Sequence, residues 1–207
     1  MTSLNAADPR SWPRASVRSL GGVCLWAGLL GAASGIALAV VPPAVADDRY
    51  SYPMTAAVFA AAQCWFALQH LGLWAGIVGL GRSAAQAPRG AVRLAAAGML
   101  LLAATELAAI AAAGSAYPGP GTGLLDALYG ISTIAVGVGL AWAGVVVARR
   151  GGWTGSTRWL PLALGIWVFV PMFPAMFGGF LAGRLAITFW MVLFALLGWA
   201  LGREGAR

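Results

Sequence analysis

The chain has 207 residues, of which 60% are hydrophobic and only 9% are charged, and its formal net charge is +7. Soluble domains carry about 25% charged residues, so this composition excludes an ordinary water-soluble protein. The basic residues form small groups between apolar runs rather than one patch on a folded domain, which excludes a nucleic-acid-binding protein.

Six apolar stretches follow one another along the chain. Each approaches or exceeds the ~20 residues that a helix needs to cross a hydrocarbon core of ~30 Å. The sequence therefore predicts an all-α fold, a polytopic membrane bundle of six transmembrane helices in a single domain over residues 1–207. A short cytoplasmic N-terminal tail is expected at 1–17. The predicted spans lie at about 20–43, 54–80, 92–114, 124–148, 158–178 and 184–202.

The distribution of arginine predicts the orientation of these spans. All 13 basic residues are arginines, and eleven of them fall before the first span, after the second, fourth and sixth, or just inside the fifth: Arg10, Arg14, Arg18, Arg82, Arg89, Arg93, Arg149, Arg150, Arg158, Arg203 and Arg207. Basic residues in short loops mark the cytoplasmic side. With six spans, both termini are then cytoplasmic (N-in, C-in), and the arginines face anionic lipid headgroups. The lysine-free, Ala- and Gly-rich composition is typical of a high-GC bacterial genome, so we expect a multi-pass protein of the bacterial inner (plasma) membrane.

The first span has two interpretations. A basic start, an apolar run and Ala44-Val45-Ala46 also fit a cleaved signal peptide over residues 1–46. However, the run from Val23 to Val41 exceeds the roughly 7–15 apolar residues of such a peptide. We favour a retained helix, and cleavage stays open as the alternative.

Glycine and proline predict how the spans pack and where one of them is interrupted. Small residues four apart allow close helix packing in lipid. We interpret these pairs as packing within the chain rather than as a dimerisation motif: Gly31/Gly35, Gly72/Gly76, Gly179/Gly183 and Gly198/Gly202. Pro171 and Pro174 predict a kink or an end of the fifth span near Val170. A helix end with a tight turn is favoured over a broken helix beside a cavity.

Two ionisable residues lie within predicted spans. Placing a charged side chain at the centre of a membrane helix costs about 2.5–3.5 kcal/mol on insertion scales, so such residues are functional candidates. Glu106 lies in the third span, where burial favours the neutral acid. His70 lies in the second span, seven residues after Gln63, so both share one helix face. Antiparallel spans place Gln63 near the depth of Glu106, and His70 roughly two turns deeper. We expect a hydrogen bond between Glu106 and Gln63, with His70 as the next polar group inward.

Other polar and sulfur-containing residues are assigned structural roles. Asp126 opens the fourth span and Arg184 opens the sixth, so we expect an ion pair between them at the outer interface. Met172 and Met176 are interpreted as core residues rather than Cu(I) ligands. One histidine cannot form a bis-His haem site, and no nucleophile or zinc-protease motif is present. No metal and no cofactor is predicted.

Three functions fit these observations. In the first, a non-enzymatic membrane protein handles a small solute, proton or lipid in a pocket lined by Glu106, Gln63 and His70. In the second, a membrane enzyme uses Glu106 as general acid on a lipidic or isoprenoid substrate, inside an aromatic cavity formed by four tryptophans. Those tryptophans are Trp26, Trp65, Trp167 and Trp190. In the third, an accessory or regulatory subunit depends on a membrane protein partner or on a second copy. The absence of recognisable catalytic motifs favours the first and third.

Overall fold

The computed structural model describes residues 14–150 and 152–204. Within these residues the fold is helical, without strands. It has six helical segments that are long and apolar enough to cross a membrane. Arg10 and Arg207 lie outside the described residues, as does the predicted N-terminal tail up to residue 13. The helices are α1 (Arg14–Val40), α2 (Ala56–Arg82), α3 (Arg89–Ala109), α4 (Thr122–Arg150), α5 (Leu160–Trp167), α6 (Phe173–Phe177) and α7 (Phe180–Glu204).

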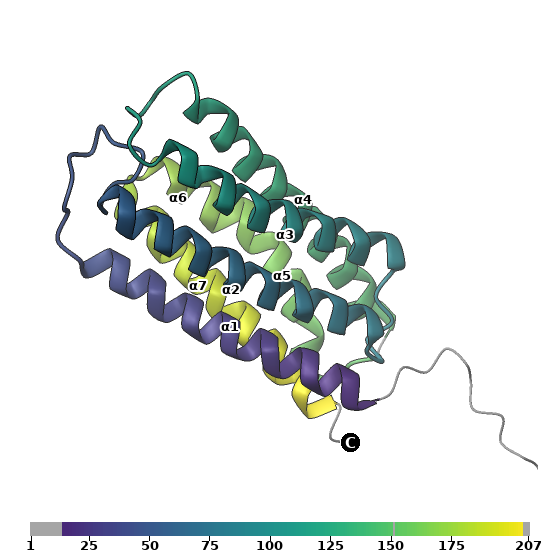
Figure 1. The fold of residues 1–207 in the computed structure, drawn as a ribbon. Coiled ribbons are helices and arrows are strands. Elements are labelled where there is room, and N and C mark those ends of the chain that lie inside the picture. Colours follow the sequence, from purple (N-terminus) through teal and green to yellow (C-terminus); the bar gives the residue numbers. More distant parts are fainter. Residues whose placement is uncertain (1–13, 151, 205–207) are drawn as a thin grey trace, which may run out of the picture.

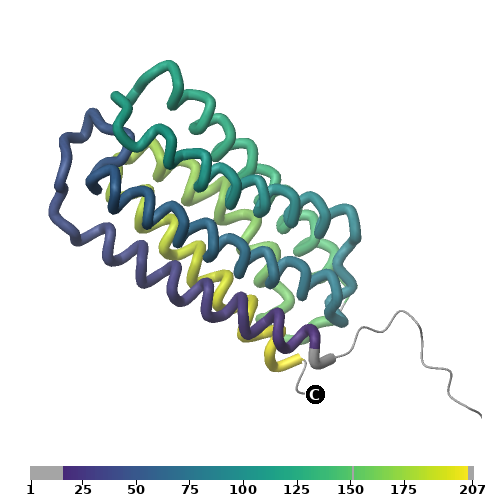
Figure 2. The backbone as a smooth tube through the Cα atoms, viewed as in Figure 1, coloured from purple at the N-terminus to yellow at the C-terminus, as the bar shows by residue number. Residues whose placement is uncertain are grey.

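The helices pack against their neighbours in the chain, and the last helix packs against the first. Thus α1 contacts α2, α2 contacts α3, α3 contacts α4, and α4 contacts α5, while α7 lies along α1 and also touches α5 and α2. In Figure 1, α1, α2 and α3 form one layer and α7 and α5 lie behind it. The start of α1 and the end of α7 lie together at one end of the bundle (Figure 2), which we call the terminal end. The opposite end, with the connections 41–55 and 113–121, is the loop end.

Arginines gather at the helix ends on one side of the bundle, as predicted. α2 ends at Arg82, α3 begins at Arg89, α4 ends at Arg149 and Arg150, and α7 carries Arg203 in its last turn. All of these helix ends lie at the terminal end. Arg49 and Arg184 belong to the loop end, as the sequence predicted.

Glycines permit the close approach of α1 and α7. A Cβ atom added at Gly28 would lie 2.6 Å from the Ala195 nitrogen, and one added at Gly198 would collide with the backbone of Leu25. Gly72 and Gly76 of α2 meet Ala27 and Cys24 of α1 in the same way. These glycines therefore serve helix packing within the chain.

The fifth apolar stretch is continuous in space but changes its helical type. A short 3-10 segment η2 (Gly155–Trp159) leads into α5, a π-helical segment η3 (Val168–Met172) contains Pro171, and α6 follows. Because proline lacks an N–H and clashes with the preceding turn, a wider turn accommodates it without ending the helix. The irregularity expected near Val170 is this π-helical segment, and the helix itself continues to Phe177, close to the predicted end of the span at 178. Gly179 then adopts φ +90°, a left-handed conformation that favours glycine, and starts the turn into α7.

The two connections at the loop end are joined to each other. Arg49 and Ala116 form an isolated antiparallel bridge. The Tyr50 N–H donates to the Ser115 carbonyl at 3.1 Å, and the Tyr117 N–H donates to the Asp48 carbonyl at 2.7 Å. The 41–55 connection is thereby held across the loop end of α2, α3 and α4.

At the terminal end, one carboxylate joins three segments. Glu204, near the end of α7, accepts the Ala84 N–H at 2.5 Å and the Trp153 indole N–H at 2.8 Å. Trp153 is buried. The connection after α2 and the connection after α4 are thus both attached to the end of α7.

Candidate functional site

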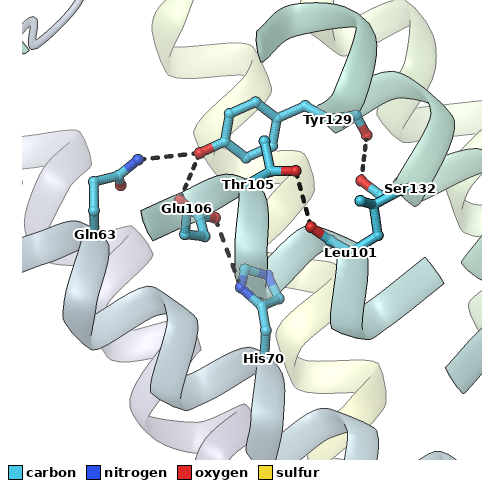
Figure 3. A network of polar contacts seen from close by, with 7 residues as sticks. All are labelled: Gln63, His70, Leu101, Thr105, Glu106, Tyr129 and Ser132. Atoms are coloured by element: carbon cyan, nitrogen blue, oxygen red, sulfur yellow. Dashed lines mark hydrogen bonds and ion pairs between the residues drawn. The ribbon is translucent and has the colours of Figure 1, made fainter. Parts of the chain in front are cut away.

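Four polar side chains from three helices meet inside the bundle, in the half nearer the loop end (Figure 3). Gln63 and His70 come from α2, Glu106 from α3 and Tyr129 from α4. The first three are buried, with 4%, 5% and 7% of their surface exposed. The structure thus brings together the three intramembrane candidates that the sequence indicated, and it adds Tyr129.

The Tyr129 hydroxyl is the centre of this group. It donates a hydrogen bond to Glu106 Oε2 at 2.7 Å and accepts one from Gln63 Nε2 at 3.0 Å. On the other side of the carboxyl group, Glu106 Oε1 lies 3.6 Å from His70 Nδ1. That nitrogen has no hydrogen-bond partner among the described residues. Both oxygens of Glu106 therefore face a polar group, one from α4 and one from α2.

Helix geometry explains why residues at different predicted depths meet. Side chains in a helix tilt toward its N-terminus. The N-terminus of α2 is at the loop end, so His70 tilts toward that end. The N-terminus of α3 is at the terminal end, so Glu106 tilts the opposite way. The two side chains converge, which closes the gap of about two turns expected from residue counting alone.

Further charged and phenolic groups surround Glu106 from the loop end. Arg184 of α7 lies within electrostatic reach of Glu106 and Tyr129. Tyr50, from the 41–55 connection, lies within reach of Glu106 and Asp126. Burial, and then the charge of Asp126, raise the pKa of the Tyr50 hydroxyl. Tyr50 is therefore a neutral hydrogen-bond donor at physiological pH.

Tyr129 is the residue that the sequence analysis missed. It lies five residues into the fourth predicted span, whereas Tyr50 and Tyr117 lie between predicted spans. Counting from the loop end, Tyr129 is seven residues into α4 and Gln63 is seven residues into α2, which places them at similar depth. That correspondence was the available signal. Where we expected a direct hydrogen bond between Gln63 and Glu106, the Tyr129 hydroxyl links the two side chains, since it accepts from Gln63 and donates to Glu106.

Asp126 and Arg184 do not form the expected ion pair. Among the described side chains, an ion pair within 4 Å joins Asp48 to Arg49, and the contact between His70 and Glu106 is an ion pair only when His70 is protonated. Asp126 instead faces Tyr117, whose hydroxyl pKa is raised by burial and then by the charge and hydrogen bond of Asp126. Arg184 lies over the ring of Phe180, 5.1 Å from its centroid. The reason is helix order, because α4 packs on α3 and α5 whereas α7 packs mainly on α1.

Residues considered for metal or aromatic sites are dispersed. The described residues contain no group of three His, Cys, Asp or Glu side chains placed to hold a metal ion. Met172 is buried in the core as expected, but the interpretation of Met176 as a core residue is wrong, because its side chain is exposed on the bundle surface. Trp26 and Trp65 are exposed on the bundle surface. Trp167 and Trp190 donate their indole N–H groups to the Ala186 and Leu164 carbonyls. These tryptophans do not enclose Glu106.

An open groove of about 380 Å³ lies between α1 and α2 on the bundle surface. Its lining is mostly apolar, with Val23, Ala27, Leu30, Trp65, Leu68, Gln69, Leu71 and Gly72. Trp65 and Gln69 both donate hydrogen bonds to the Ser34 hydroxyl, at 3.0 and 3.1 Å. Glu106 is not part of this groove. The groove is therefore a feature separate from the four-residue site.

No protein-family model, no curated protein and no solved structure matches this chain.

Proposed function

We propose that this is a non-enzymatic multi-pass protein of the bacterial inner membrane that binds and releases a proton at Glu106 while handling a small solute. The observation that carries the proposal is the contact set of Glu106, a carboxyl group buried among Tyr129, Gln63 and His70 from two other helices. The terminal end, with its arginines, faces the cytoplasm in this proposal, and α1 is retained because it packs along both α2 and α7.

The chemistry of the pair Glu106 and His70 supports proton exchange. A single charged side chain in a hydrocarbon environment costs free energy, so an ionisable residue inside a membrane helix indicates a functional role. Glu106 Oε1 and His70 Nδ1 face each other at 3.6 Å. They can share one proton in two arrangements, a carboxylic acid beside neutral imidazole or a carboxylate beside imidazolium. Tyr129 donates to Glu106 in both arrangements, so it orients the carboxyl group throughout.

The surroundings favour this function over acid catalysis by Glu106. An enzyme acting on an isoprenoid or other lipidic substrate needs an apolar cavity next to its acid. The tryptophans that were expected to form one lie on the bundle surface or are bonded to backbone carbonyls of α5 and α7. The groove between α1 and α2 does not include Glu106.

Infrared difference spectroscopy of the purified protein in lipid nanodiscs tests the proposal. Spectra are recorded as the buffer is changed from acid to alkaline, and the carboxyl C=O band reports each protonated acid. We expect a band from a buried carboxylic acid that titrates in the wild-type protein and disappears in Glu106→Gln. His70→Ala should shift the titration of that band, because it removes the group facing Oε1.

Asp47→Asn is the matched control, because Asp47 is an exposed carboxylate in the 41–55 connection and makes no contact with the four-residue site among the described residues. It should leave the buried band in place. Glu106→Gln and wild-type spectra that coincide over the whole titration would refute proton binding at Glu106.

A further inference from the structure

We infer that, in the described state, Glu106 exchanges its proton with the loop end of the bundle only. The described structure is then the state in which the terminal side is closed by a thick apolar barrier and the loop side by a thin one. This inference rests on the proposed function, because it specifies the direction of access to that same site.

Polar groups continue from Glu106 toward the loop end. Tyr129 contacts Glu106 directly. Arg184 and Tyr50 are its next electrostatic neighbours. Beyond Tyr50, Asp126 is exposed at the start of α4. A proton entering from this side therefore meets an exposed carboxylate first and titratable or hydrogen-bonding groups after it.

The interior between His70 and the terminal end is apolar. In the described part of the chain, every buried hydroxyl, amide, imidazole or carboxyl side chain lies level with His70 or nearer the loop end. From Leu71 to Leu80, α2 contains only apolar residues, a rise of roughly 15 Å. The core beside this segment is almost fully buried and includes Leu73, Ile77, Leu80, Met99, Leu140 and Leu197.

The few polar atoms in this apolar barrier do not form a proton path. The Trp74 indole N–H, one turn beyond His70, is buried without a hydrogen-bond partner among the residues that the structure describes, and an indole does not take up a proton at ordinary pH. The Cys24 thiol donates to the Phe194 carbonyl and packs beside Gly76. Neither offers a titratable acceptor facing His70. A charge crossing this region would lose its hydration without gaining a partner.

The thin barrier on the loop side is an aromatic layer. The Tyr50 ring packs against Phe59 and Tyr117, with centroids 5.9 and 5.7 Å apart. Tyr50 is held there through its own N–H bond to Ser115. Local opening of the 41–55 connection would break a small number of contacts, whereas opening the terminal side would require separation of several fully buried helix interfaces.

Cysteine accessibility in membrane vesicles of both orientations tests this inference. In a Cys24→Ala, Cys64→Ala background, Glu106→Cys is exposed to a charged, membrane-impermeant methanethiosulfonate. The control variant Thr55→Cys identifies the loop-end side, and the control variant Ser83→Cys identifies the terminal-end side. The assay therefore does not depend on the predicted orientation. Gln63→Cys is the second reporter, since it touches Tyr129 from α2.

We expect Glu106→Cys and Gln63→Cys to react from the side that labels Thr55→Cys and not from the side that labels Ser83→Cys. Adding Tyr50→Ala removes two aromatic contacts, so the rate from the loop side should rise about tenfold. Labelling from the terminal side at an equal or greater rate would overturn the inference. No labelling from either side, even with Tyr50→Ala, would overturn it as well.

This assay is independent of proton binding. If labelling follows the expected side while the infrared band is unaffected by Glu106→Gln, the direction of access holds and the proposed function fails. If the infrared band depends on Glu106 but labelling comes from the terminal side, the proposed function holds and the inferred direction fails.

Discussion

The clearest test of the four-residue site is the removal of one oxygen atom, by Tyr129→Phe. The substitution keeps the ring and deletes the hydroxyl that donates to Glu106 at 2.7 Å and accepts from Gln63 at 3.0 Å. Hydrogen bonds between membrane helices contribute about 0.6 kcal/mol on average and up to about 1.7 kcal/mol. Here two bonds are lost and two buried polar groups lose a partner, so we expect a loss of about 1–2 kcal/mol in unfolding free energy.

Equilibrium unfolding in mixed micelles, with increasing denaturing detergent and circular dichroism as the signal, measures this loss. Tyr52→Phe is the matched control. The Tyr52 ring packs edge-on against Phe180 at 5.3 Å, and its hydroxyl makes no hydrogen bond within the described residues. We expect Tyr52→Phe to cost less than about 0.5 kcal/mol.

A double-mutant cycle separates the bond to Glu106 from general effects on packing. In a Glu106→Leu background the Tyr129 hydroxyl has lost its acceptor and keeps only Gln63. We expect Tyr129→Phe to cost about half as much there as in the wild type. If Tyr129→Phe and Tyr52→Phe are equally stable, or if the two substitutions in the cycle are simply additive, the hydroxyl does not hold Glu106 in the way described.

Two further predictions concern packing and the terminal end. Gly28→Ala places a methyl group against the backbone of Ala195 and should lower the unfolding free energy by about 1–3 kcal/mol in the same unfolding assay. Gly22→Ala on the same helix is the control, because its methyl group meets nothing within 4 Å and should leave the unfolding free energy nearly unchanged. Glu204→Ala removes the acceptor of the Ala84 N–H and of the buried Trp153 indole N–H, so it should raise hydrogen–deuterium exchange in the connections after α2 and after α4. Glu204→Gln keeps one acceptor oxygen and should raise the exchange less.

The helices themselves were predictable because each depends on a local property. A run of about 20 apolar residues can be recognised without knowing what it packs against. The observed helices therefore agree with the predicted spans within a few residues at most ends, although α1 already includes Arg14. In the fifth stretch the sequence predicted a kink or an end near Val170 without deciding between them, because the effect of Pro171 depends on its neighbours. Packing against α4 and α7 favours a wide turn over a helix end.

The site was predictable in part for the same reason. Glu106, His70 and Gln63 stand out because lipid excludes such residues, and the spacing of seven puts two of them on one face. Tyr129 did not stand out, because a tyrosine is common near membrane interfaces and only its contacts show its role. The expected pair of Asp126 and Arg184 failed because equal depth does not make two helices neighbours.

The sequence alone determined three features: the number of apolar helices long enough to span a membrane, the separation of most arginines to one end, and the identity of Glu106, His70 and Gln63 as buried polar groups. These depend on hydropathy and charge, which each segment carries by itself. The tertiary structure alone decided that Tyr129 joins Glu106 to Gln63, that the 41–55 connection covers the site, and that the interior beyond His70 is apolar. These features depend on which helix faces run side by side, and residues distant in the chain meet only when the lateral packing of the helices is set.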